Sequence, residues 1–285
     1  MNQNNYNVSP FHAKSEYRVK HNHNKLLLKN KLIDQESSPH EAVIVIIYHT
    51  KEEEVTQYHY NRFKNFNPEI PIVLIKHEDF ELLPYWDYHD MWAHPDSILY
   101  RWFLSDKKIL AERYFVFEYD TYCNDSIKNH YKDVWNDQAA ASNHFSIQKY
   151  PSWSVFKKYP KHLNIYKDKL YGICPAFGFM LRHDDLSDLI NEQINSTIWK
   201  DVYCELRIGS ILNINGVKLS FINEQKKHYN SPSYYEIPKN YKQILGIFHP
   251  VKDKPKCLSL PFVEGIGCND KDIFFKVWSR NKLIY

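Results

Sequence analysis

The chain has 285 residues, enough for one α/β domain with a sizeable core. Its formal net charge of +3 is too close to neutral to indicate nucleic acid as a partner. Five cysteines without CxxC spacing predict neither a zinc site nor a disulfide framework, and they favour a reduced, cytoplasmic compartment. No apolar run is long enough for a transmembrane segment, so we expect a soluble protein, with peripheral membrane contact left open.

The first elements predict a strand–helix–strand unit. Residues 1–40 are polar and indicate a flexible arm. The apolar run at 42–47 (AVIVII) predicts a strand buried on both faces, as in a parallel sheet. Apolar positions at helical spacing after Thr50 predict a helix that ends at Asn67, and the run at 72–75 predicts a second buried strand. This order is typical of a βαβ unit.

The following elements continue the same alternation. Residues 80–97 indicate an irregular connection, and we expect further helices at 98–110, in a stretch that runs through Trp135, from Asp184 or Asp185, and at 200–214. We expect further strands at 114–117, 139–141 and 217–221, and an extended entry into a strand at 174–181. We predict an α/β fold class with a Rossmann-like, mostly parallel sheet flanked by helices in a single domain. The predicted boundaries are 41–255 for that domain and 256–285 for a tail packed on it.

An acid pair follows the third predicted strand. Glu118 and Asp120 lie at its carboxyl end, where open α/β sheets bind ligands. Residues two apart in an extended chain point to the same side, and two close carboxylates repel each other unless a cation or a proton lies between them. Mg²⁺ and Mn²⁺ prefer oxygen ligands and often share them with phosphates. We therefore predict a Mn²⁺ or Mg²⁺ site, with surface turn acids as the alternative.

A βαβ unit, a helix and an apolar strand that ends in a DxD-like acid pair together resemble the GT-A glycosyltransferases over residues 42–253. The resemblance implies metal-dependent transfer of a sugar from a nucleotide-sugar, such as a UDP-sugar, to a hydroxyl group of a glycan, lipid or protein. Glu118 departs from the pattern, in which an aspartate is usual. The donor-binding residues implied by the resemblance are Tyr48, His49, Thr50, Arg101, Glu118, Tyr119, Gly178 and Lys252.

The resemblance also implies a third metal ligand and a catalytic base. His249 in a late loop would complete the metal shell of Glu118 and Asp120. Glu205, at the start of a predicted helix, matches the acid that serves as general base in inverting members, and Asp201 is the alternative base. The retaining outcome stays open. A structural role is the alternative for each residue: Glu205 could be an exposed helix acid paired with Arg207 or Lys200.

Two other functions stay open. A nucleotidyltransferase usually has a glycine-rich loop after its first strand, where this chain has Tyr-His-Thr. A catalytically silent carbohydrate- or protein-binding module could have the same fold. Motifs of dinucleotide dehydrogenases, P-loop kinases, zinc proteases and α/β-hydrolases do not occur in the sequence.

Overall fold

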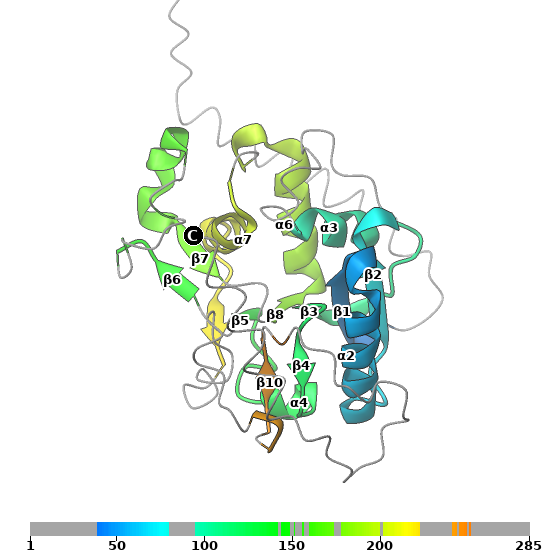
Figure 1. The fold of residues 1–285 in the computed structure, drawn as a ribbon. Coiled ribbons are helices and arrows are strands. Elements are labelled where there is room, and N and C mark those ends of the chain that lie inside the picture. Colours follow the sequence, from blue (N-terminus) through cyan, green and yellow to red (C-terminus); the bar gives the residue numbers. More distant parts are fainter. Residues whose placement is uncertain are drawn as a thin grey trace, which may run out of the picture.

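The computed structural model describes residues 39–79, 95–141, 144–148, 151, 156, 160–173, 178–199, 202–222, 241–243, 245–249 and 251. Its centre is a six-stranded sheet in the order β2-β1-β3-β8-β5-β9, shown in Figure 1. The strands are β1 (His40–Tyr48), β2 (Ile72–Lys76), β3 (Ala111–Glu118), β5 (Ala139–Ala141), β8 (Phe179–Arg182) and β9 (Leu219–Phe221). Only β8 runs antiparallel to its neighbours in this sheet. The predicted α/β fold with a mostly parallel sheet is therefore confirmed.

Helices cover both faces of the sheet. On one face, Val43, Val45 and Ile47 of β1 belong to a core shared with α3 (Asp96–Leu104), α6 (His183–Asn195) and α7 (Cys204–Ile214). On the other face, Ile44 and Ile46 pack in a core with α2 (Glu53–Phe66) and α4 (Ile127–His130). Figure 1 shows these two groups of helices above and below the strands. Burial on both faces explains why β1 is apolar at successive positions.

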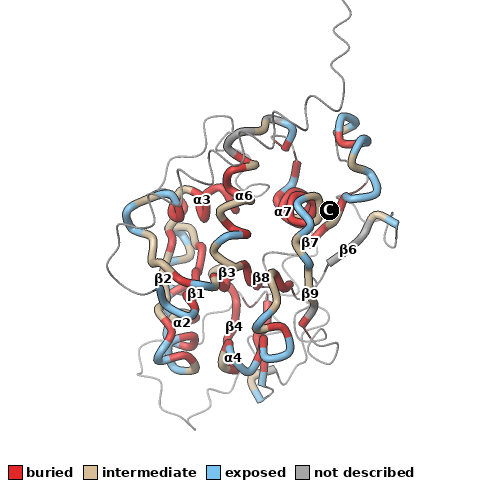
Figure 2. Tube along the Cα trace, turned by 180° about the vertical axis from the view of Figure 1, so that it is seen from behind, coloured by how far each residue is buried: buried red, intermediate tan, exposed pale blue. Residues whose placement is uncertain are grey.

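Two small ribbons and several 3-10 turns complete the described chain. Strands β4 (Tyr122–Cys123) and β10 (Ile247–Phe248) form one antiparallel ribbon, and β6 (His144–Ser146) and β7 (Tyr171–Ile173) form the other. The 3-10 turns are η1 (Thr50–Glu52), η2 (His77–Asp79), η4 (Lys161–Lys169), η6 (Thr197–Trp199) and η7 (Tyr241–Gln243). In Figure 2 the buried stretches include most of β3, β8 and α7.

Helix boundaries differ from the expected ones. Helix α3 begins at Asp96 and ends at Leu104, six residues early, because the backbone at Ser105 is extended and its hydroxyl donates to the carbonyl of Trp102. The expected helix up to Trp135 is reduced to α4, and α7 begins only at Cys204. The predicted tail at 256–285 and nearly all of the predicted arm at 1–40 lie outside the described residues.

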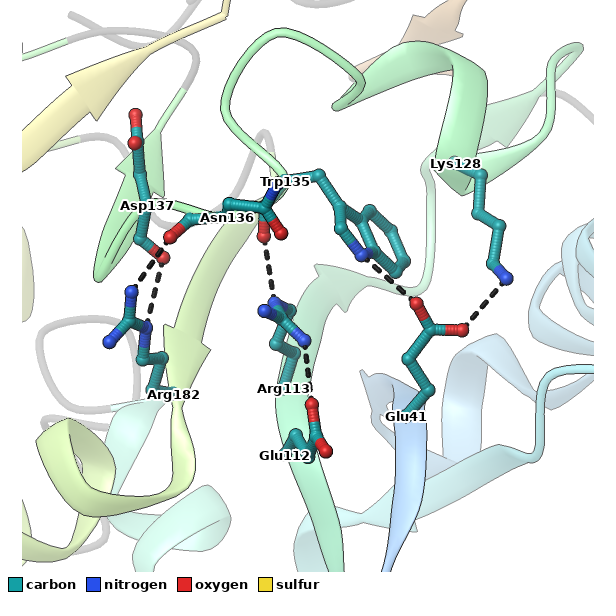
Figure 3. A network of polar contacts seen from close by, with 8 residues as sticks. All are labelled: Glu41, Glu112, Arg113, Lys128, Trp135, Asn136, Asp137 and Arg182. Atoms are coloured by element: carbon teal, nitrogen blue, oxygen red, sulfur yellow. Dashed lines mark hydrogen bonds and ion pairs between the residues drawn. The ribbon is translucent and has the colours of Figure 1, made fainter.

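A polar network fixes the end of the sheet opposite to the carboxyl ends of β1 and β3 (Figure 3). Three successive backbone carbonyls, of residues 135–137, accept hydrogen bonds from Arg113 and Arg182. Glu41 accepts from the indole of Trp135 at 3.1 Å and from Lys128 at 2.8 Å. These bonds anchor the loop that leads into β5, so this end of the sheet has a structural role.

Candidate metal and donor site

Two carboxylates and one imidazole converge at the carboxyl end of β3. Each of Glu118, Asp120 and His249 offers one ligand atom within 4.8 Å of the other two. The chain turns directly after β3, where the amide of Thr121 donates to the carbonyl of Glu118 at 3.1 Å. Asp120 is 1% exposed and His249 is 5% exposed, whereas Glu118 is half-buried. The turn therefore leaves one carboxylate partly open to solvent and buries the other.

The β4–β10 ribbon explains how a residue 131 positions further along reaches this turn. Phe248 pairs with Tyr122 in the ribbon, so the next residue, His249, lies opposite the turn that holds Asp120. The amide of Val251 then donates to the carbonyl of Asp120 at 2.7 Å. Two backbone-paired segments thus fix the relative positions of the acid and the histidine, independently of their side chains.

Side chains of helix α2 form hydrogen bonds to the β4–β10 ribbon and to the residues that follow each of its strands. The buried His59 donates from Nε2 to the carbonyl of Val251 at 3.0 Å, because a carbonyl oxygen can only accept. Burial lowers the pKa of His59 to about 4 and keeps the ring neutral. Arg62 donates to the carbonyl of Cys123 and to the side chain of Asn124, both at 2.8 Å, and lies 4.0 Å over the ring of Tyr122. Side chains of α2 therefore hold the segments that carry Asp120 and His249 in place.

Protonation of His249 offsets part of the negative charge of Glu118 and Asp120. Its Nε2 lies 2.9 Å from Asp120 Oδ1 and 3.2 Å from Glu118 Oε2. Burial lowers the pKa of His249, but the charges of Asp120 and Glu118 and the hydrogen bonds to them outweigh burial and raise that pKa to about 9. Two hard oxygen ligands and an imidazole at this spacing fit Mn²⁺ or Mg²⁺, which would take the place of the proton.

A pocket adjoins the cluster on the side of α3. It is lined by apolar side chains and by the two acids Asp96 and Glu118; the apolar lining residues are Ile47, Pro95, Leu99, Val116, Phe117 and Phe179. Glu205 lies in the first turn of α7. Burial raises its pKa to about 7, and the charge of Glu118 contributes to the shift. A carboxyl group with this pKa can accept or donate a proton near neutral pH.

The predicted donor-binding residues of β1 lie at the same edge of the sheet. Tyr48 is half-buried, and burial together with the charge of Glu53 raises its pKa. The ring of His49 stacks on that of His77, with centroids 3.8 Å apart. Burial and the neighbouring His49 lower the pKa of His77 to about 4, so His77 is neutral. Thr50 begins η1, and its side chain is outside the described part of the chain.

The other predicted site residues are placed as follows. Tyr119 is half-buried between the two acids. Arg101 is half-buried on α3 and is not among the residues that line the pocket, so its contact with a nucleotide stays a prediction. Asp201 and Lys252 lie outside the described residues.

Gly178 has a structural reason to be glycine. Its φ is +90°, which side chains rarely tolerate, and a Cβ there would lie 2.3 Å from Phe117 Cε1 and 2.6 Å from the hydroxyl of Tyr131. The close approach shown by the structure is therefore to the core beneath the acid pair. Contact between Gly178 and a donor sugar stays a prediction.

One feature near the pocket is not predicted from the sequence. Arg207 does not lie on an exposed face beside Glu205, as one alternative supposed; it is fully buried and forms an ion pair with Asp96. The two residues are 111 positions apart, so no local spacing indicates the pair. Asp96 belongs to a segment expected to be irregular, which further concealed it.

The sequence matches no protein-family model and no curated protein. Among solved structures, the chain is similar to "a glycosyltransferase involved in the glycosylation of the major capsid of PBCV-1" (11% identity, TM-score 0.42, 73% of this chain and 94% of that chain). It is also similar to the galactosyltransferase LgtC in complex with donor and acceptor sugar analogs (10%, 0.40, 85% and 98%) and to the bifunctional glycosyltransferase WbbM (9%, 0.41, 78% and 48%).

These similar structures are glycosyltransferases, the class to which the sequence resemblance points. Identities of 9–11% and TM-scores of 0.40–0.42 make the likeness distant, so the chemistry of the site is inferred from its own residues. Within the described part of the chain, no helix combines the length and the apolarity that crossing a membrane requires.

Proposed function

We propose that this protein is a metal-dependent glycosyltransferase that uses a nucleotide-sugar donor. The observation that carries the proposal is the convergence of Glu118, Asp120 and His249 at the carboxyl end of β3, beside a pocket. Glu118 would bind the cation, and it also lines that pocket. A divalent cation at this position would bind the donor diphosphate and neutralise the charge that develops on it as the leaving group.

The residues of the chain supply the remaining chemistry. In an inverting displacement, the acceptor hydroxyl oxygen forms a bond to the anomeric carbon while the bond from that carbon to the diphosphate breaks. Glu205 takes the hydroxyl proton, and its raised pKa of about 7 makes it a stronger base than an ordinary carboxylate. Asp201 is the alternative base.

The donor would bind along the carboxyl ends of β1 and β3. Tyr48, His49 and Thr50 would line the base and ribose pocket. Arg101 would contact the nucleotide, and Lys252 would meet the phosphates. Tyr119 and Gly178 would also contact the donor. We propose a UDP-sugar as the donor, a hydroxyl group of a glycan, lipid or protein as the acceptor, and the cytoplasm as the location.

Two alternatives make different predictions. A silent carbohydrate-binding module would bind sugar without metal and would not release a nucleotide. A nucleotidyltransferase would release pyrophosphate from a nucleoside triphosphate. The half-buried Glu205, whose pKa is raised by burial and by the charge of Glu118, favours an enzyme over a module, because holding a carboxyl group in such surroundings without a use for it costs stability.

A thermal-shift panel of UDP, GDP, CMP and their sugars, each with and without Mn²⁺, tests the proposal. We expect Mn²⁺-dependent stabilisation by one nucleotide and by its sugars, followed by slow release of the nucleotide from the matching sugar. Stabilisation by no nucleotide, in the presence of Mn²⁺, would contradict the proposal. Release of pyrophosphate from UTP would favour the nucleotidyltransferase.

A further inference from the structure

A buried ion pair links the two walls of the candidate site. Arg207 is fully buried and Asp96 is 4% exposed. Arg207 Nε donates to Asp96 Oδ2 at 3.2 Å, and Nη2 donates to Asp96 Oδ1. The hydroxyl of Tyr100 donates to Asp96 Oδ2 at 2.8 Å, so the carboxylate has three donors. This arrangement fixes the carboxylate and the guanidinium in one plane and one direction.

Each member of the pair is attached to a different part of the site. Asp96 begins α3 and lines the pocket next to Glu118. Arg207 belongs to the first turns of α7, two residues after Glu205. Its remaining nitrogen, Nη1, donates to the backbone carbonyls of Val202 and Trp199, which precede the helix. One side chain therefore ties α3, the approach to α7 and the first turns of α7 together.

Stability alone does not account for this pair. Desolvating two charges costs as much as their attraction returns, and a well-packed apolar pair of similar volume is often equally stable. Leu99, Leu206 and Ile208, which lie close to the pair along α3 and α7, are apolar and buried in the core. An apolar pair has no preferred direction, however, whereas the planar guanidinium fork fixes the rotation and height of α7 relative to α3.

We propose that Asp96 and Arg207 are positioning residues that hold the first turn of α7 in place, so that the Glu205 carboxylate faces the reacting atoms beside Glu118. This inference rests on the proposed function, in which Glu205 is the base. The Asp96 carboxylate already accepts three hydrogen bonds, so neither residue acts directly on the substrate in this scheme. A displacement of the base by about 1 Å is expected to cost up to about 100-fold in turnover without weakening the binding of metal or donor.

The test compares the full-length wild-type chain with two variants. The double variant Asp96→Leu/Arg207→Met replaces the pair with apolar side chains, and Arg207→Lys keeps the charge but loses the fork. UDP release from UDP-glucose, UDP-galactose and UDP-N-acetylglucosamine in Mn²⁺ gives kcat and the donor KM. Calorimetry gives the Mn²⁺ affinity, and amide hydrogen exchange of the peptide covering 199–207 reports on the start of α7, with the β3 peptide as the internal control.

We expect both variants to fold, kcat to fall by about 10- to 100-fold in the double variant, and KM and the Mn²⁺ affinity to change by less than about twofold. Exchange should accelerate in the 199–207 peptide and not in β3. Wild-type kcat in both variants, or an equal loss of Mn²⁺ affinity, would overturn the inference. Absence of UDP release by the wild-type chain would refute the proposed function, and the exchange of the 199–207 peptide would still decide whether the pair positions α7.

Discussion

Replacing Glu205 with glutamine should stabilise the protein, and only above the pH at which an unfolded glutamate ionises. Burial and the charge of Glu118 raise the pKa of Glu205 from 4.5 to about 7. Between these two values the unfolded chain has released a proton that the folded chain still holds, so the free energy of unfolding falls as pH rises through this window. The difference in pKa corresponds to about 3 kcal/mol. A glutamine does not ionise and is free of this cost.

Urea unfolding at pH 5, 6, 7 and 8 in EDTA measures the effect. The free energy of unfolding of Glu205→Gln minus that of the wild type should increase by up to about 3 kcal/mol from pH 5 to pH 8. The matched control is Glu112→Gln on β3, where the carboxylate is 59% exposed; its difference should stay within about 0.5 kcal/mol at every pH.

A second variant separates the two causes of the shift. Glu118→Gln removes the neighbouring charge but leaves Glu205 buried, so the pH effect of Glu205 should become smaller without disappearing. A difference between Glu205→Gln and the wild type that does not change with pH would refute this reasoning. It would mean that the carboxyl group of Glu205 is hydrated in the folded chain, and Glu205 would then lose its support as the base.

Three further outcomes are expected. Asp120→Ala should lower donor turnover by at least about 100-fold while leaving the far-ultraviolet circular dichroism spectrum unchanged, because it removes a proposed metal contact to the leaving group; a wild-type rate would contradict the site. Gly178→Ala should lower the free energy of unfolding in urea by about 2–4 kcal/mol, since the added Cβ meets Phe117 at a φ of +90°, and a loss below about 0.5 kcal/mol would contradict this packing. His59 has a pKa of about 4 in the folded chain and does not take up the proton that the unfolded chain accepts below about pH 6.5, so the free energy of unfolding should fall between pH 6.5 and pH 4. The variant His59→Gln keeps a donor for Val251 and should remove up to about 3 kcal/mol of that fall in urea unfolding. An unchanged pH dependence would argue against a neutral, buried His59.

The central strands could be predicted because their burial leaves a direct trace in the sequence. β1 is buried on both faces and is apolar at successive positions from Ala42 to Ile47, and the run before Glu118 behaves in the same way. The place of Glu118 and Asp120 at a strand end follows from that assignment. These patterns depend only on neighbouring residues, which a single sequence contains.

The supports of the site depend on distant pairs and could not be predicted. β4 and β10 have two residues each, too few to show alternation, yet their pairing brings His249 to Asp120. The expectation that His249 joins the acids came from the resemblance to a family and not from its surroundings in the sequence. Asp96 and Arg207 are charged residues, and residues of that kind are usually exposed, so only the fold shows that they are buried together.

The most direct test of the metal centre is a calorimetric titration of Mn²⁺, then UDP, into the metal-free chain at pH 7.5. The wild-type chain should bind one Mn²⁺, and UDP should bind only after it. Asp120→Ala and His249→Ala should each weaken Mn²⁺ binding and abolish the metal-dependent binding of UDP. Equal binding of UDP with and without Mn²⁺, or unchanged Mn²⁺ binding in both variants, would contradict the assignment of Glu118, Asp120 and His249 as the metal centre.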